Sequence, residues 1–406
     1  MKKILISIIC IITLFSSISY VSAKKITIDS DYAIVLDPSN NQVLYEKNGY
    51  EKMYPASMTK LVTVYLALKQ IKDVNDSVVI QPYDLETLVE TNASVANFEL
   101  NEKTTYLDLL YGAMLPSGAD ATRALARLTS GSIEAFVDDM NEWTKEMGFT
   151  HTHFANPTGI HDDNHYTTAY EMAMITKIVL EDSQFRTIFT TKKWTSQNKK
   201  HTWSANMLVI AEAYGLNVDF ILGSKTGYTL EAELCLASLI QVGEKELIVI
   251  VGHGNKDEKD TPIKDTTILK QYFEDTYDVV TVKKKDQILD SLSFNNTPKT
   301  LDIKLENDIM IYLPKDYQKN DIEFRYHYDI DQAPIKRDSK IGSIEVIYQD
   351  AVIYKQDLIS NQEIKEDLLG YYLMYFFQYL PYLIVVVVIL IAVLIISKKS
   401  KRRKRK

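Results

Sequence analysis

Hydrophobic and polar positions between residues 24 and 275 follow the helix period in some segments and the strand period in others, which predicts mixed secondary structure. Two short runs, 33–37 and 42–47, flank four turn residues and predict a hairpin. Two continuous apolar runs, 234–240 and 247–251, predict buried strands. Helical spacing of apolar residues predicts helices over 58–71, 105–114, 119–130, 132–147, 168–181 and 261–275. Strands at both ends with helices between them indicate an α+β domain.

Residues 276–360 follow a different pattern, in which apolar and polar side chains alternate and turn residues separate the runs. Alternation of this kind is typical of strands with one buried face. It is found over residues 301–305, 309–313, 322–326, 341–347 and 352–359. The pattern predicts a small all-β domain after the α+β domain, followed by an amphipathic link over residues 361–378.

Residues 1–23 have the pattern of a secretory signal peptide. Lys2 and Lys3 precede an apolar run over residues 4–15, and Val21-Ser22-Ala23 resembles a cleavage site. The sequence therefore predicts that the body of the protein, from residue 24 onward, is exported.

Residues 379–397 are almost entirely apolar and follow an aromatic-rich segment. Such a stretch is long enough to cross a hydrocarbon core of roughly 30 Å, although Pro381 either ends the span or kinks it. Residues 398–406 carry eight Lys and Arg side chains, which directly after a span indicate the cytoplasmic side. We expect a single-pass cell-membrane protein with an extracytoplasmic body and a cytoplasmic tail.

The charge of the chain is divided unevenly. Its net charge is −8, and because residues 1–23 carry +2 and residues 398–406 carry +8, the remaining body carries −18. A body this acidic argues against nucleic acid as a partner. Of the two cysteines, Cys10 belongs to the predicted signal peptide, so Cys235 has no partner for an intramolecular disulfide and is predicted to be a core residue.

Three short motifs follow one another along the α+β region: Ser57-Met58-Thr59-Lys60, Ser117-Gly118-Ala119 and Lys225-Thr226-Gly227. The S-x-x-K pattern also begins at Ser22 and Ser196, but only the copy at Ser57 opens an apolar helical run. K-T-G occurs once and precedes a predicted buried strand. Order and context therefore select Ser57, Lys60 and Ser117 as candidate catalytic residues and Lys225 as a candidate binding residue.

These residue types suit nucleophilic catalysis. A serine hydroxyl reacts well only when a base removes its proton, and Lys60 lies one helical turn after Ser57 on the same face. A lysine base must be neutral, which requires burial or a nearby cation such as Lys225 to lower its pKa. Ser117 would complete the network and pass a proton to the leaving amine.

The remaining predicted roles concern binding. Lys225 and Thr226, with Gly227 beside them, are predicted to hold a terminal carboxylate, the lysine acting as a point charge. The backbone N–H groups of Ser57 and Tyr228 form the natural pair of donors for an oxyanion hole. We expect no cofactor and no metal, because metal-motif spacing is absent from the four clustered histidines, His151, His153, His161 and His165.

The motifs resemble those of active-site serine penicillin-binding proteins and β-lactamases. The fuller resemblance, over about residues 30 to 275, is to the serine D-Ala-D-Ala carboxypeptidases, which are low-molecular-mass penicillin-binding proteins. It is carried by Tyr54-Pro55-Ala56-Ser57-Met58-Thr59-Lys60, by Asn156-Pro157-Thr158-Gly159-Ile160-His161 with Tyr166-Thr167-Thr168-Ala169, and by Gly223-Ser224-Lys225-Thr226-Gly227-Tyr228-Thr229.

This resemblance implies a penicillin-binding-protein/β-lactamase-like catalytic domain over residues 24–275. It also implies removal of the terminal D-Ala from peptidoglycan stem pentapeptides through a Ser57 acyl-enzyme, and covalent binding of β-lactams. Members of the family often carry a β-rich domain and a C-terminal membrane attachment, which agrees with the predicted domain at 276–360 and the span at 379–397.

Two positions depart from the family pattern and leave alternatives open. Ala119 stands where the family usually has asparagine, and Tyr228 stands where some relatives have histidine. The loss of the amide favours, as one alternative, a weakly catalytic protein that binds peptidoglycan or penicillin. A β-lactamase is a second alternative, disfavoured because no E-x-x-L-N segment follows the second motif. Endopeptidase or transpeptidase activity on the same residues also remains open.

Overall fold

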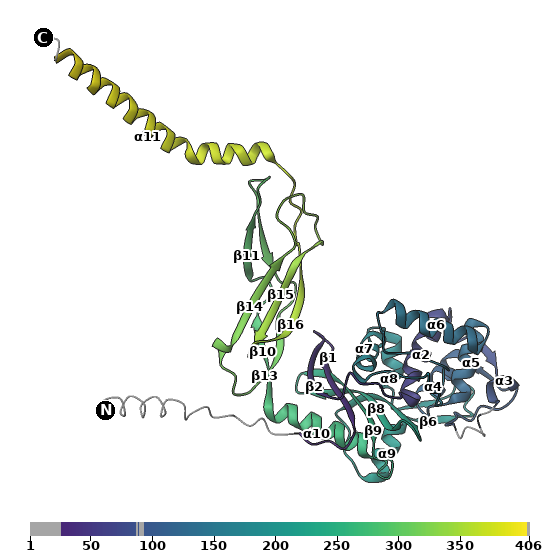
Figure 1. Ribbon diagram of the computed structural model, residues 1–406. Helices are drawn as coiled ribbons and strands as arrows, with labels where there is room; N and C mark the ends of the chain where they lie inside the picture. The colour runs from purple at the N-terminus through teal and green to yellow at the C-terminus, as the bar shows by residue number, and fades with distance from the viewer. Residues whose placement is uncertain (1–25, 87, 89–92, 404–406) are drawn as a thin grey trace, which may run out of the picture. The chain divides into compact units, whose positions relative to one another are not determined.

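The computed structural model describes residues 26–86, 88 and 93–403, with side chains described up to residue 396. The predicted signal peptide and the last three residues of the predicted basic tail lie outside the described residues. The chain divides into two compact units (Figure 1). The first comprises the described residues up to Val35 together with Tyr45–Phe273, and the second comprises Leu36–Leu44 and the chain from Glu274 onward.

A five-stranded sheet carries the K-T-G motif on an edge strand. The strand order is β2-β1-β9-β8-β7, and neighbouring strands β7, β8 and β9 run antiparallel, with Lys225 opposite Ala237. The apolar runs of β8 and β9 are buried, as their continuous hydrophobicity predicts, and Cys235 lies among these core residues. The strands are β1 (Tyr32–Asp37), β2 (Gln42–Lys47), β7 (Ile221–Thr229), β8 (Glu233–Val242) and β9 (Lys245–Gly254).

Helices of the first unit gather beside this sheet (Figure 1), where α7 contacts β9 and α8 contacts β7. Helix α2 lies inside the cluster, in contact with α4, α5, α6 and α7, and is buried along most of its length. The bounds are α2 (Lys60–Gln70), α3 (Pro82–Leu85), α4 (Tyr106–Met114), α5 (Ala119–Ser130), α6 (Ile133–Glu146), α7 (Ala169–Leu180), α8 (Ser183–Thr190), α9 (Asn206–Tyr214) and α10 (Thr261–Thr276). Two short two-stranded antiparallel sheets belong to the same unit: β3 (Ser77–Val79) with β4 (Lys103–Thr105), and β5 (Lys193–Thr195) with β6 (Thr202–Ser204).

The predicted hairpin and all six predicted helices are present, with one local difference. The segment that begins with the nucleophile motif forms a 3-10 turn, η1 (Ala56–Thr59), before α2 starts at Lys60, rather than one α-helix from residue 58. Helices α3, α8 and α9 were not predicted. They are four, eight and nine residues long, so α3 and α8 span few turns over which the helix period can emerge from the sequence, whereas α9 was missed although it is as long as the predicted α4.

The second unit is built from seven strands in three antiparallel groups. Strand β13 pairs with β10, β12 pairs with β11, and β15 lies between β14 and β16. The bounds are β10 (Tyr277–Lys283), β11 (Ile288–Ser293), β12 (Thr300–Lys304), β13 (Ile309–Pro314), β14 (Ile322–Tyr328), β15 (Lys340–Tyr348) and β16 (Ala351–Ile359). The alternating runs therefore form the predicted all-β domain.

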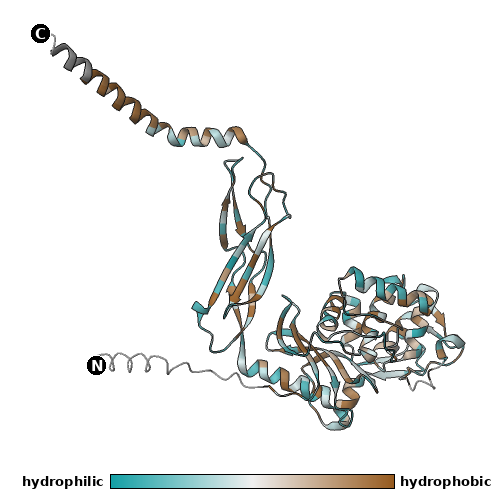
Figure 2. Ribbon diagram, in the orientation of Figure 1, coloured by the Kyte–Doolittle hydropathy of each residue, from teal (hydrophilic) through white to brown (hydrophobic). Residues whose placement is uncertain are grey.

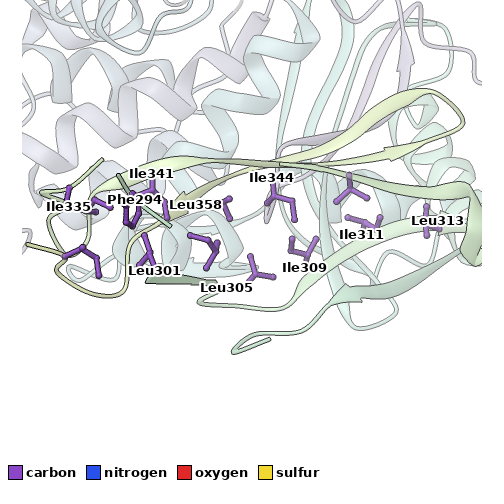
Figure 3. Close-up of a cluster of buried hydrophobic side chains, with 14 residues drawn as sticks. Phe294, Leu301, Leu305, Ile309, Ile311, Leu313, Ile335, Ile341, Ile344 and Leu358 are labelled. Atoms are coloured by element: carbon purple, nitrogen blue, oxygen red, sulfur yellow. The ribbon is translucent and has the colours of Figure 1, made fainter. Parts of the chain in front are cut away.

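One hydrophobic core joins these strand groups. Figure 3 shows Ile309, Ile311 and Leu313 of β13 in the same cluster as Ile344 of β15 and Leu358 of β16. Every second residue of β13 and of β12 faces this cluster, as expected for strands with one buried face. Burial of these side chains gives the small domain a core of its own.

The second unit ends in α11 (Leu368–Arg403), which begins inside the segment predicted as an amphipathic link. Among the described residues, one helix is long and apolar enough to cross a membrane, and it covers Leu368–Ile396 with its side chains exposed. Figure 2 shows the hydrophobic part of this helix as a continuous segment. Pro381 lies inside the helix and removes one backbone donor, which is a common cause of a kink.

Candidate active site

The nucleophile motif places its serine and lysine side by side. Ser57 lies in the η1 turn and Lys60 is the first residue of α2, and the Lys60 Nζ donates a hydrogen bond to the Ser57 Oγ at 2.8 Å. Residues three apart are eclipsed in a 3-10 turn, so the local change from α to 3-10 geometry favours this contact. The arrangement matches the predicted pairing of a serine with a lysine base.

The turn before Ser57 is strained and closely surrounded by backbone. Ala56 adopts a left-handed conformation with φ of 46°, which non-glycine residues rarely take. A Cβ added to Gly159 would lie 1.9 Å from the Ala56 carbonyl oxygen, and one added to Gly227 would lie 3.2 Å from the Ser57 nitrogen. The two glycines therefore let the 156–160 segment and strand β7 approach the nucleophile turn from two sides.

Lys60 is buried and contacts the protein on two sides. Besides Ser57, its Nζ donates to the carbonyl oxygen of Thr158 at 2.5 Å, and only 2% of the residue is exposed. Burial lowers the pKa of Lys60 from 10.5 to about 7, and the negative charge of Asp120 opposes that shift. A large share of Lys60 is thus neutral near pH 7, which is the state a general base requires.

The second and third motifs meet at another lysine. The Nζ of Lys225 donates to the Ser117 Oγ at 2.8 Å and to the Thr226 carbonyl oxygen at 2.8 Å. Burial lowers the pKa of Lys225 well below its usual value, and the charge of Lys60 adds to this effect. Ser117 itself has a φ of 66°, so both serines of the site lie in or beside left-handed backbone.

A cleft of about 650 Å³ brings the motifs together. Its lining includes six of the seven residues to which the sequence assigns a role: Ser57, Lys60, Ser117, Thr226, Gly227 and Tyr228. Lys225, the seventh, is 1% exposed and lies behind this lining, connected to it through Ser117 and Thr226. Lys225, the lysine predicted to hold the carboxylate, is therefore not itself exposed to the cleft. It is connected to the cleft through its hydrogen bonds to Ser117 and Thr226.

The alanine of the second motif also faces the cleft. Ala119 is almost fully buried, and its backbone N–H donates to the Ser94 carbonyl oxygen at 2.8 Å. The next residue, Asp120, accepts backbone N–H bonds from Ala96 at 2.8 Å and Phe98 at 3.1 Å. These bonds hold the 93–98 segment against the start of α5, so the wall of the cleft is formed without the amide that the family usually has here.

Several residues at this site carry no motif that would mark them individually. Asn156 accepts from the backbone N–H groups of Thr158 at 3.1 Å and Gly159 at 2.8 Å, which shapes the loop that presents the Thr158 carbonyl to Lys60. His165 is buried behind the nucleophile turn, and His161 lines the cleft. The sequence marked Asn156 and His161 through the family-like segment at 156–161, and His161 and His165 through the histidine cluster, but it did not indicate their contacts. The bonds from Lys60 to Thr158 and between Thr59 and His165 join residues about a hundred positions apart.

Comparison with known proteins identifies the class of this site. A family model described as D-alanyl-D-alanine carboxypeptidase matches residues 19–255, and a model of the C-terminal domain of penicillin-binding protein 5 matches residues 277–366. The chain is 30% identical over 341 residues to the D-alanyl-D-alanine carboxypeptidase DacF of Bacillus subtilis, covering 80% of this chain and 85% of DacF. It is 26% identical over 348 residues to the D-alanyl-D-alanine carboxypeptidase DacC of Escherichia coli, covering 84% of this chain and 85% of DacC.

Solved structures agree with this grouping. The structure of penicillin binding protein 5 from Haemophilus influenzae superposes with a TM-score of 0.71 at 25% identity, covering 84% of this chain and 99% of that one. The structure of the Streptomyces K15 DD-transpeptidase matches with a TM-score of 0.56 at 27% identity, and the match covers 61% of this chain and 98% of the transpeptidase chain.

The fold and site thus define a penicillin-binding-protein-like serine peptidase with a C-terminal all-β domain, and the predicted fold class is confirmed. The chain belongs to the D-alanyl-D-alanine carboxypeptidase family of serine peptidases, as the resemblance of its motifs implied. It is accordingly a hydrolase of the serine carboxypeptidase type, and neither the β-lactamase nor the weakly catalytic alternative is favoured by these relatives.

Proposed function

We propose that this protein removes the terminal D-Ala from peptidoglycan stem pentapeptides through an acyl-enzyme formed on Ser57. The observation that carries the proposal is the pair of Ser57 and Lys60: the two side chains are 2.8 Å apart and the pKa of Lys60 is about 7. Neutral Lys60 accepts the proton of Ser57 as the Oγ attacks the carbonyl carbon between the two D-Ala residues. The negative charge that develops on the carbonyl oxygen is stabilised by the backbone N–H groups of Ser57 and Tyr228.

Collapse of the tetrahedral intermediate requires a proton on the leaving amine. We assign this step to Ser117, whose hydroxyl lies 2.8 Å from Lys225 and lines the same cleft as Ser57. The proton passes from protonated Lys60 through Ser117 to the amine, free D-Ala departs, and water then attacks the ester carbon with Lys60 again as base. β-Lactams acylate Ser57 by the same attack, with opening of their ring.

The substrate carboxylate has a place in this scheme beside the third motif. Two buried lysines cannot both be cationic at low cost, and burial lowers the pKa of both Lys60 and Lys225. A bound carboxylate near Thr226 and Gly227 favours the protonated form of Lys225 by charge attraction. Protonated Lys225 in turn favours neutral Lys60, so substrate binding itself prepares the base.

The proposed location of the enzyme is supported by helix α11 and by the basic residues that follow its apolar segment. The apolar segment Leu368–Ile396 is compatible with a membrane anchor, and eight of the nine residues 398–406 are Lys or Arg. We propose that the helix crosses the cell membrane once, with the basic tail in the cytoplasm and the catalytic unit outside, where peptidoglycan is available.

A weakly catalytic binding protein is retained as a second candidate because of Ala119. The methyl group cannot make the hydrogen bonds of an amide to the substrate backbone, which corresponds to a loss of about 1–3 kcal/mol in transition-state binding. Such a protein would be acylated by penicillin but would release D-Ala slowly.

Release of D-Ala from diacetyl-L-Lys-D-Ala-D-Ala by the full chain in detergent micelles tests the proposal. Release that disappears in Ser57→Ala and persists in Ser196→Ala supports it, because Ser196 begins another S-x-x-K pattern but lies outside the cleft lining. Penicillin labelling of Ser57 without measurable D-Ala release would instead favour the binding protein, and unchanged release in Ser57→Ala would refute the acyl-enzyme.

A further inference from the structure

His165 is a buried histidine with a defined partner on each ring nitrogen. Only 2% of the residue is exposed, and it lies directly behind the nucleophile turn. Its Nδ1 accepts the backbone N–H of Ala155 at 3.1 Å, and its Nε2 lies 2.7 Å from the Thr59 Oγ1. Thr59 is the residue of the nucleophile motif that directly precedes Lys60.

These contacts determine which nitrogen of His165 carries the proton. A backbone N–H can only donate, so the Nδ1 that faces Ala155 must be unprotonated. The ring proton is therefore on Nε2, which donates to the Thr59 hydroxyl, and the hydroxyl is left to donate to the Ala56 carbonyl oxygen at 2.8 Å. The three hydrogen bonds run in one direction, from Ala155 through the ring and Thr59 to Ala56.

The neutral form of His165 is supported by its surroundings. Burial lowers the pKa of His165 to about 3, so the ring stays neutral over the range in which Lys60 titrates. Its electrostatic neighbours are one carboxylate, which favours the cation, and three basic groups, which oppose it: Asp162, His153, Lys60 and His161.

The chain of hydrogen bonds ends on the strained residue. Ala56 has a φ of 46°, and such a conformation persists only where its surroundings hold it. The bond from Thr59 to the Ala56 carbonyl is one such restraint, and it orients the peptide unit that joins Ala56 to Ser57. That peptide unit includes the Ser57 N–H, one of the two proposed oxyanion donors.

The same ring closes the loop that supplies the second contact of Lys60. Residues 155 and 165 are the ends of this loop, hereafter the 155–165 loop, and the bond between Ala155 and the His165 ring holds them together. Inside the loop, Asn156 organises the turn that directs the Thr158 carbonyl toward the Lys60 Nζ. His165 thus connects the loop to the nucleophile motif at Thr59.

We propose that His165 is a positioning residue for the reaction proposed above, on which this inference rests. Through Thr59 it holds the Ala56–Ser57 turn in its strained conformation, and through the 155–165 loop it keeps the Thr158 carbonyl on Lys60. It is not among the residues that line the cleft, and its ring bonds to Thr59 and Ala155 rather than to Ser57, so it orders the catalytic groups without exchanging a proton with them.

The test compares His165→Leu, which removes both hydrogen bonds, with His165→Gln, whose amide retains a donor and an acceptor. For the full chain in detergent, we expect His165→Leu to lower kcat and the rate of Ser57 acylation by benzylpenicillin at least about tenfold, with KM changed less than about threefold. We expect His165→Gln to recover most of that loss. His153→Leu is the matched control, because His153 belongs to the same region but has an exposed side chain, whose hydrogen bond goes to the Asn164 carbonyl and whose ring stacks on Tyr166.

Two further measurements keep the outcome decisive. Thr59→Val replaces the hydroxyl with a methyl group of similar size. It should reproduce the effect of His165→Leu if the hydrogen-bond chain is responsible, even where the leucine variant folds poorly. The acid limb that Lys60 imposes near pH 7 should persist in His165→Gln, because His165 does not titrate there. Wild-type acylation rates in folded His165→Leu and Thr59→Val, or loss of the acid limb in His165→Gln, would overturn the positioning role.

Acylation by penicillin does not require peptide turnover, so the two proposals can fail separately. A chain that is acylated at Ser57 but releases no D-Ala would refute the carboxypeptidase function, while the acylation rates of the variants would still decide the role of His165. Normal D-Ala release with no effect at His165 or Thr59 would refute the positioning role alone.

Discussion

Replacing the proposed base with methionine should inactivate the enzyme and, at neutral pH, stabilise it. Lys60→Met keeps the unbranched shape of the side chain and removes the amine. In the folded protein burial lowers the pKa of Lys60 from 10.5 to about 7. The folded state therefore binds fewer protons than the unfolded state between pH 7 and 10.5, so this lysine destabilises the fold at neutral pH and less so as the pH rises.

The size of the effect follows from these pKa values. A change of one pKa unit corresponds to about 1.4 kcal/mol, so the cost of burying Lys60 is about 4 kcal/mol at pH 7 and about 1.4 kcal/mol at pH 9.5. Lys60→Met also leaves the Thr158 carbonyl oxygen without its partner, which costs about 1–3 kcal/mol at either pH. We expect the variant to be more stable than the wild type by about 1–3 kcal/mol at pH 7, and that advantage to fall by about 3 kcal/mol at pH 9.5.

Denaturant unfolding followed by tryptophan fluorescence measures this difference. All three tryptophans, Trp143, Trp194 and Trp203, lie in the first unit, so their emission reports on the catalytic unit rather than on the all-β unit. Lys52→Met, at an exposed lysine close to the nucleophile motif, controls for the general effect of pH on stability.

The pH dependence is the decisive quantity because the lost hydrogen bond contributes equally at both pH values and cancels. A stability difference between Lys60→Met and the wild type that stays constant from pH 7 to pH 9.5 would show that the pKa of Lys60 is not lowered. In that case Lys60 could not act as a base near neutral pH, and the proposed mechanism would lose its first step.

Three further predictions concern the walls of the cleft. Asp120→Asn removes a negative charge that raises the pKa of Lys60, so the acid limb of the pH–acylation profile should move to lower pH; a move to higher pH would contradict this. Gly159→Ala places a Cβ 1.9 Å from the Ala56 carbonyl oxygen at a φ of 81°, and should lower stability by more than about 1 kcal/mol and abolish penicillin labelling, whereas normal labelling would show that the turn can move aside. Ala119→Asn introduces the amide usual in the family and should raise kcat/KM for D-Ala release by about 5- to 150-fold, equivalent to about 1–3 kcal/mol. An unchanged kcat/KM would show that this cleft does not use the amide.

Much of the architecture was predictable because it depends on local patterns. The hairpin over β1 and β2, the six predicted helices and the alternating strands of the all-β unit each repeat a period over enough residues to be recognised. The exceptions are helices α3, α8 and α9 and the segment around Ser57. At that segment, the close approach of the 155–165 loop and of strand β7 accompanies a 3-10 turn in which Ala56 is strained. A conformation imposed by neighbours distant in sequence leaves no periodic signal.

The same distinction between local pattern and tertiary contact applies to the active site. The sequence alone selected the candidate site residues, since three motifs in a particular order distinguish Ser57, Lys60, Ser117 and Lys225 from many other serines and lysines. It could not determine their protonation, because the pKa of a lysine depends on its burial and its charged neighbours, and these exist only in the folded chain.

Tertiary structure alone decided how these groups are held. It placed Lys225 behind Ser117 instead of free in the cleft, set the Thr158 carbonyl against Lys60, and joined His165 to Thr59 across 106 positions of sequence. Each of these contacts links segments that have no local reason to meet. They form because the burial of helix α2 and of the sheet brings the segments together, and buried polar groups then require hydrogen-bond partners.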